Sequence, residues 1–217
     1  MIGIGVITYN RPKHLELFLK QIEKHTKDYS LYVHDDSIER KGIAYGSNMC
    51  LHNLKDCEHI FLFNDDCFPI ADGWAEYFIN SKLNHSLYMN GEYSPILQQD
   101  NYTSYKHASG VFMHLTKKVV ERVGYFNPLY DKYGFEHAAY SHRICRAGLI
   151  RSRFISLNDC NKYLYALDLQ GDKGYEYLEH KRTLTDTEKN EQIQKNNETY
   201  LRETSINKVY YEFENII

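Results

Sequence analysis

The chain has 217 residues, a formal net charge of −3, and 25% charged against 42% hydrophobic residues. This length can bury one substantial core, and the composition is that of a globular protein rather than a disordered or coiled-coil one. The near-neutral charge does not suggest nucleic-acid binding, and no apolar run approaches the roughly 20 residues of a membrane helix. We therefore expect one globular unit with no nucleic-acid partner and no transmembrane segment.

The cysteines indicate reduced thiols. An odd number of them, without CxxC spacing, predicts neither a disulfide framework nor a zinc or redox site. They are Cys50, Cys57, Cys67, Cys145 and Cys160. The first residues form a strand-like run without the basic region and the cleavage site of a secretory signal. Together these observations predict a cytoplasmic location.

Strand and helix patterns alternate through the first 80 residues. Continuous apolar runs predict strands, and apolar residues at i, i+3, i+4, i+7 spacing predict helices. The expected order is strand 2–7, a helix from Pro12, strand 31–33, helix 42–54, strand 60–63 and helix 73–79. This alternation predicts an α/β fold with a Rossmann-like, mostly parallel central sheet and helices on both faces.

A polar cluster follows each predicted strand, at residues 8–11, 34–37 and 64–66. In parallel sheets, ligands bind beyond the carboxyl ends of the strands. The three clusters should therefore meet at one edge, and their convergence is stronger evidence for a site than any single cluster.

The acidic residues of these clusters have two interpretations each. Asp65 and Asp66 could hold Mg²⁺ or Mn²⁺, which prefer oxygen ligands and bridge to diphosphates. The alternative is a solvated pair in a turn, which is common for adjacent acidic residues. Asp35 and Asp36 could accept hydrogen bonds from a nucleoside, or they could stabilise a turn.

The cluster at 8–11 joins a strand to a helix N-terminus. Free backbone amides at such a terminus can contact phosphate or a base edge. Asn10 can cap the helix, and Pro12 suits its first turn, so an ordinary capped loop is the alternative.

The second half of the chain is less regular. We expect a strand at 109–113, a helix at 116–123 and a helix from about residue 136 that ends at Gly148. From about residue 183 the chain is polar, and the capping-box spacing of Thr185 and Glu188 predicts a terminal amphipathic helix.

Two neighbouring residues are candidates for a general base. Glu136 and His137 could each take a proton from a hydroxyl within hydrogen-bonding reach. Glu136, Tyr140 and Arg143 fall at i, i+4, i+7, which predicts a shared polar face suited to a cleft. The alternatives are an ion pair between Glu136 and Arg143, and a neutral His137 packed on the helix. His180 could be a metal or phosphate ligand or a surface residue.

Several segments occur in an order that matches a known family. They are VITYNRPKHLELFL, HDDS, a glycine- and asparagine-containing segment from Lys41-Gly42 to Asn48, FLFNDDCFPIADGW, and SGVFMHLTKKVVERVGYFNPLYDKYGFEHAAYSHRICRAG. In this combination the chain resembles a family 2 glycosyltransferase with the GT-A fold. The resemblance covers residues 2–150, with a weaker continuation to His180.

The resemblance implies a nucleotide-sugar donor, usually a UDP-sugar, and a divalent cation, Mn²⁺ or Mg²⁺. The DxD motif of the family falls on Asn64-Asp65-Asp66, with Asp66 as the direct metal ligand and His180 as a further candidate. The pair ED of the family falls on Glu136-His137, with Glu136 preferred as the base. The remaining donor-site residues that it implies are Thr8, Tyr9, Asn10, Arg11, Asp35, Asp36 and Asn48.

The resemblance further implies a metal-dependent, inverting transfer of a sugar to a hydroxyl of a glycan, lipid-linked or protein-bound acceptor. Two other functions stay open, namely a catalytically inactive GT-A-like domain that binds glycans and a sugar nucleotidyltransferase. We expect a glycosyltransferase domain at 1–182, divided into a donor half (1–105) and an acceptor half (106–182), and a helical extension at 183–217.

Overall fold

The computed structural model describes residues 1–89, 93–171, 174–178 and 184–215. Its strands are β1 (Ile2–Thr8), β2 (Tyr29–Asp35), β3 (His59–Asn64), β4 (Cys67–Pro69), β5 (His85–Leu87), β6 (Pro95–Gln98), β7 (Tyr102–Tyr105), β8 (Phe112–Thr116), β9 (Ile155–Leu157) and β10 (Leu164–Ala166). Its α-helices are α1 (Pro12–His25), α2 (Ile43–Leu54), α3 (Trp74–Asn80), α4 (Lys117–Val123), α5 (Glu136–Arg146), α6 (Leu167–Gln170) and α7 (Asp186–Ser205). Short 3₁₀ turns lie at Cys160–Lys162 and Phe213–Asn215.

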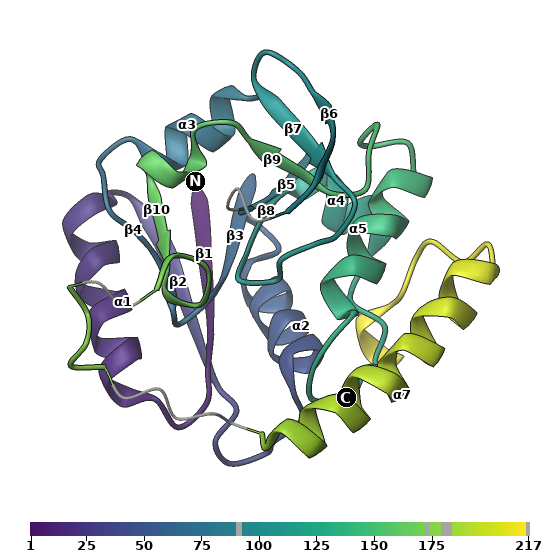
Figure 1. Cartoon of the computed structure of the whole chain (residues 1–217). Helices are drawn as coiled ribbons and strands as arrows, with labels where there is room; N and C mark the ends of the chain where they lie inside the picture. Colours follow the sequence, from purple (N-terminus) through teal and green to yellow (C-terminus); the bar gives the residue numbers. More distant parts are fainter. Residues whose placement is uncertain (90–92, 172–173, 179–183, 216–217) are drawn as a thin grey trace.

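The central sheet has the order β2-β1-β3-β8-β5-β9-β7-β6 (Figure 1). β1 pairs in parallel with both β2 and β3, which confirms the alternation predicted for the first 80 residues. From β8 onward the pairing is mixed, because β8 runs antiparallel to β3 and to β5. The predicted α/β class is confirmed, with its parallel part confined mainly to the first half of the chain. A small second sheet pairs β10 with β4.

Helices cover both faces of the sheet, as predicted. Phe18 of α1 and Trp74 of α3 pack with Phe63 of β3 on one face. On the other face, a second core cluster takes Leu51 from α2 and Ile144 from α5. The residues of β3 from 60 to 63 are buried, which explains why this strand reads as a continuous apolar run.

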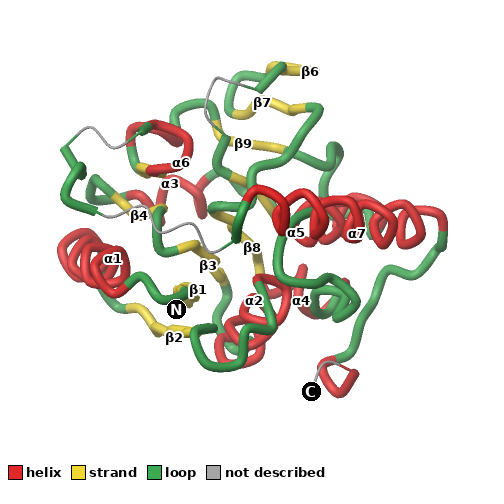
Figure 2. Tube along the Cα trace, turned by 60° about the horizontal axis from the view of Figure 1, so that its bottom comes forward, coloured by secondary structure: helices red, strands yellow, loops and turns green. Residues whose placement is uncertain are grey.

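The terminal helix predicted from the capping box is α7. Thr185 accepts a hydrogen bond from the amide of Glu188, whose side chain in turn accepts from the amide of Thr185. α7 lies along α5 in both views (Figures 1 and 2). The residues of α7 that it buries are polar, Asn196 and Glu203 among them, so specific pairing rather than an apolar stripe seats this helix.

The interpretation of Arg143 as a cleft-facing residue beside Glu136 is wrong. Arg143 is 1% exposed and its Nε lies 2.9 Å from Oε1 of Glu203 on α7. It also donates hydrogen bonds to the carbonyl oxygens of Val123 and Tyr125. Beyond Glu136, the i, i+4, i+7 face of α5 therefore turns into the core, where polar partners for Arg143 come from distant segments.

The cysteines are free thiols, and Cys145 alone among them is not fully buried. Within the described ranges, no helix is both long enough and apolar enough to span a bilayer.

Candidate functional site

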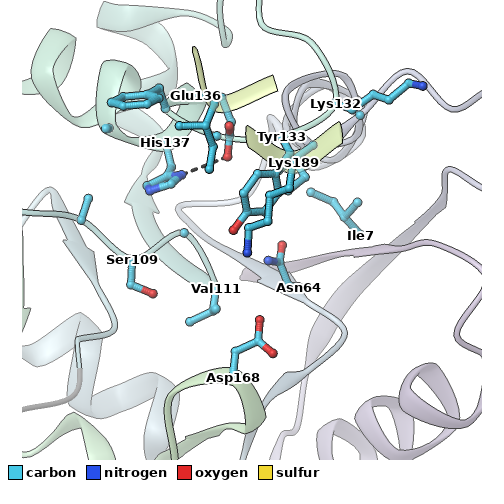
Figure 3. Close-up of a pocket in the computed structure, with 18 of the residues that line it drawn as sticks. Ile7, Asn64, Ser109, Val111, Lys132, Tyr133, Glu136, His137, Asp168 and Lys189 are labelled. Atoms are coloured by element: carbon cyan, nitrogen blue, oxygen red, sulfur yellow. Dashed lines mark hydrogen bonds and ion pairs between the residues drawn. The ribbon is translucent and has the colours of Figure 1, made fainter. Parts of the chain in front are cut away.

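A pocket of about 1140 Å³ lies beyond the carboxyl ends of β1 and β3. It brings together residues from both halves of the chain and from α7 (Figure 3). Of the residues singled out in the sequence, those that line it are Thr8, Tyr9, Arg11, Asp36, Asn64, Asp66, Glu136 and His137. The convergence of the polar clusters at one edge of the sheet is thus observed in the geometry.

Other candidates do not line this pocket. Asn48 is fully buried, and its side chain accepts from the amide of Phe126 (2.7 Å) and donates to the carbonyl of Phe126 (3.1 Å). It therefore clamps α2 to the segment before α5. Asn10 has a positive φ of 52° and its amide donates to Ser37 Oγ (2.8 Å), so this residue shapes the loop. His180 lies outside the described residues.

Only one of the two aspartates that follow β3 lines the pocket. Asp65 is fully buried, is absent from the pocket lining, and accepts a hydrogen bond from Thr8 Oγ1 (2.5 Å). Asp66 lines the pocket. The guanidinium of Arg11 contacts both carboxylates, and its Nη2 lies 3.1 Å from Asp66 Oδ2.

These contacts set the charge balance of the site. Burial raises the pKa of Asp65, while the neighbouring Arg11 opposes this rise. Burial lowers the pKa of Arg11, but the charges of Asp66 and Asp65 outweigh it and the net pKa is raised. Arg11 thus stays a cation and neutralises part of the acidic pair.

One oxygen of Asp66 remains available to a ligand. Asp66 Oδ1 is buried and has no hydrogen-bond partner among the described residues, whereas Oδ2 contacts Arg11. An unpartnered buried carboxylate oxygen is costly unless something binds it. Asn64 and Asp168 supply further oxygen atoms to the same pocket. Such hard oxygen ligands fit a divalent cation such as Mn²⁺ or Mg²⁺.

The described residues hold no cluster of three or more His, Cys, Asp or Glu side chains that could bind a metal by themselves. A cation held by this pocket would therefore need additional ligands. Mg²⁺ commonly obtains these from waters and substrate phosphates.

Asp35 and Asp36 build the loop that follows β2. Asp35 Oδ1 accepts from the amide of Ser37 (2.9 Å) and does not line the pocket. Asp36 accepts from the amides of Lys41 (2.8 Å) and Gly42 (2.9 Å). Burial opposes the ionisation of Asp36, but His34 and these amides outweigh burial and lower its pKa. Asp36 therefore presents an ionised carboxylate at the pocket wall.

Glu136 and His137 form a hydrogen-bonded pair at the start of α5 (Figure 3). His137 Nδ1 lies 2.9 Å from Glu136 Oε1, and Glu136 is only 3% exposed. Burial by itself would raise the pKa of Glu136, but the hydrogen bond and charge of His137 outweigh it and lower the pKa. Glu136 Oε2 is buried with no described hydrogen-bond partner.

The backbone around this pair is constrained. Gly134 and Phe135 both have positive φ, at 98° and 70°, and a left-handed phenylalanine immediately before α5 is an uncommon conformation. A Cβ at Gly110 would meet the ring of His137 at 2.5 Å, so only glycine permits this close approach. The turn before α5 and the glycine opposite it together hold the His137 ring against Glu136.

Sequence reasoning missed several residues of the pocket. Asp168 of α6 and Lys189 of α7 both line it, together with Tyr133 (Figure 3). Asp168 is brought to the site because the amide of Leu167 donates to the backbone oxygen of Asp66 (2.9 Å). No local sequence pattern indicates a contact between residues a hundred positions apart in the chain. The capping box at Thr185 located the start of α7, but did not indicate what α7 contacts.

Comparison with solved structures identifies the architecture. A mutant of Drosophila β1,4-galactosyltransferase 7, in complex with manganese, UDP-Gal and xylobiose, superposes with a TM-score of 0.54 at 14% identity, over 87% of this chain and 79% of that one. GalNAc-T7 with UDP, GalNAc and Mn²⁺ gives 0.56 at 12% identity, over 78% of this chain and 44% of that one. The chain has the GT-A fold.

A third GT-A structure, a mannosyltransferase from Pyrobaculum calidifontis with GDP-Man and Mn²⁺, gives a TM-score of 0.50 at 13% identity over 68% of this chain and 52% of that one. In sequence, the chain is 27% identical over 136 residues to an uncharacterised glycosyltransferase, R363, of Acanthamoeba polyphaga mimivirus. That match covers 57% of this chain and 53% of the viral protein, so the chain spans about half the length of that relative. No family model matches the chain.

Proposed function

We propose that the chain is a glycosyltransferase that moves a sugar from a nucleoside diphosphate, preferably UDP, to an acceptor hydroxyl. The observation that carries this proposal is the placement of Asp66 and Glu136 in one pocket of a GT-A fold, each with an unpartnered buried oxygen. UDP and divalent manganese occur with similar folds in β1,4-galactosyltransferase 7 and GalNAc-T7, which supports a nucleotide-sugar site here.

The donor occupies the side of the pocket formed by β1 and β3. Thr8, Tyr9 and the Asp36 loop contact the nucleoside, whose base needs hydrogen-bonding partners at the strand ends. The guanidinium of Arg11 lies beside the acidic pair, where it offsets negative charge on the diphosphate.

A divalent cation would be held by Asp66 Oδ1, with Asn64 and Asp168 as neighbouring oxygen donors. When bound, the cation supplies Lewis-acid stabilisation of the departing diphosphate. His180 stays a proposed additional ligand from outside the described residues.

Glu136 removes the acceptor proton. Its Oε2 takes the proton while the acceptor oxygen attacks the anomeric carbon, and the bond from that carbon to the diphosphate breaks. This single displacement inverts the anomeric centre. His137 orients Glu136 through Oε1 and lowers the pKa of Glu136, so that the carboxylate is ionised at neutral pH.

A donor-hydrolysis assay tests the proposal against its alternatives. Purified protein with Mn²⁺ is supplied separately with UDP-, GDP- and TDP-sugars, and release of the nucleoside diphosphate is measured. Turnover of one donor supports the glycosyltransferase. Nucleotide binding without turnover in the presence of a range of glycan acceptors indicates the inactive glycan-binding domain. Formation of a nucleotide-sugar from a nucleoside triphosphate and a sugar phosphate indicates the nucleotidyltransferase.

A further inference from the structure

The inner face of α7 forms part of the pocket wall. Asp186, Lys189, Ile193 and Tyr200 all line the pocket, and their spacing of three, four and seven places them on one side of the helix. A helix that only capped the fold would not need to present these side chains to a cavity. α7 therefore adds a wall to a site whose other walls come from β1, β3 and α5.

The position of α7 relative to the pocket is fixed by specific bonds. Asn196 is fully buried, accepts from the amide of Asp131 (3.1 Å) and donates to the carbonyl of Tyr133 (2.9 Å). Lys195 Nζ adds a contact of 2.8 Å to Asp131 Oδ2. These bonds tie the helix to the segment 131–133, which leads into Glu136.

Lys189 extends from this wall into the pocket. Its ammonium lies 5.0 Å from the centre of the Tyr133 ring, and in Figure 3 the side chain passes Tyr133 toward Asn64. None of the ion pairs formed between described residues includes Lys189. The nearby Glu188 is engaged with Thr185, whose amide and hydroxyl both donate to its Oε2 at 2.8 Å.

We propose that Lys189 binds the diphosphate of the bound donor directly, through its ammonium group. This inference rests on the proposed function, since it needs a nucleotide-sugar in the pocket. The diphosphate is the only fixed negative charge of an ordinary hexose nucleotide, and Asn64 and Asp66 mark the strand end where it would lie. Lys189 has less conformational freedom than an unrestrained lysine, because its helix is anchored and its ammonium lies over the ring of Tyr133. Less conformational entropy is therefore lost when it binds phosphate.

Calorimetric titration with uridine, UMP and UDP tests the assignment, with Mn²⁺ held constant. For Lys189→Gln we expect about a tenfold weaker Kd for UDP, equivalent to about 1.4 kcal/mol, and an unchanged Kd for uridine. Lys189→Arg should restore most of the UDP affinity, because the charge is retained. Lys208→Gln is the matched control, since Lys208 packs on Tyr211 (4.1 Å) and does not line the pocket.

The outcomes separate this inference from the proposed function. Equal UDP affinity in Lys189→Gln and the wild type overturns the role of Lys189 while the nucleotide site stands. An equal loss for uridine and UDP also overturns it, because it would indicate damage to the pocket rather than a missing charge. A wild-type protein that binds none of the three ligands overturns the proposed function and this inference with it.

Discussion

Replacing Arg11 by glutamine removes the countercharge of a buried carboxylate. Arg11 contacts both Asp65 and Asp66, and its own side chain is 18% exposed while that of Asp65 is fully buried. Removing one partner of a buried ion pair typically costs about 3–5 kcal/mol, because the other charge is left without compensation. We expect a cost at the lower end of this range, because Arg11 is partly exposed and Thr8 still donates a hydrogen bond to Asp65. The free energy of unfolding should therefore fall by about 3 kcal/mol.

Urea denaturation followed by circular dichroism measures this loss. With a slope of about 2–3 kcal/mol per molar urea, the midpoint of Arg11→Gln should fall by roughly 1 M. The double variant Arg11→Gln/Asp65→Asn should recover most of the loss, because an amide needs no countercharge, and comparison with Asp65→Asn completes a double-mutant cycle. An unchanged midpoint for Arg11→Gln, or a double variant no more stable than it, would refute the assignment of Arg11 as the countercharge of Asp65.

Further predictions concern the base and the seating of α7. Glu136→Gln should lower sugar transfer at least about 100-fold while UDP still binds; a variant with near wild-type turnover would exclude Glu136 as the base. His137→Ala should keep measurable transfer but move the acidic limb of the kcat/KM profile to higher pH, because burial then dominates the pKa of Glu136. In the wild type that limb should lie below the ordinary glutamate value of 4.5. Glu203→Gln leaves Arg143 buried without its partner and should cost about 3 kcal/mol in urea unfolding; a change under 1 kcal/mol would contradict the seating described for α7.

The parts of the fold that the sequence predicted are those with strong local patterns. The continuous apolar run of β3 and the helical spacing of apolar residues in α1 both indicate which positions are buried. The capping box at Thr185 marks the first turn of α7. The polar clusters at the strand ends converge as predicted, because parallel strands bring their carboxyl ends to one edge.

The parts that the sequence did not predict depend on partners far apart in the chain. Asp65 and Asp66 are adjacent, identical in type and both buried, yet only Asp66 lines the pocket, while Asp65 is held by Thr8. The partner of Arg143 is Glu203, sixty residues away, rather than its helical neighbour Glu136. Neither the difference between Asp65 and Asp66 nor the partner of Arg143 produces a periodic pattern in the sequence.

The contribution of α7 to the pocket wall also depends on contacts between distant parts of the chain. Lys189 occurs in a largely polar helix, and the bonds of Asn196 and Lys195 to the segment before α5 help to bring it to the site. Polar seating of this kind gives no apolar stripe, which is the pattern that would have indicated a packed face.

The proposed function requires this pocket to bind a nucleoside diphosphate through a cation held by Asp66. Isothermal titration of UDP into the wild-type protein and into Asp66→Asn, each with Mn²⁺ and then with EDTA, tests it most directly. We expect EDTA to weaken UDP binding by the wild type. Asp66→Asn should bind UDP weakly whether or not Mn²⁺ is present, with an unchanged circular dichroism spectrum. UDP binding of equal affinity in all four titrations would contradict this expectation.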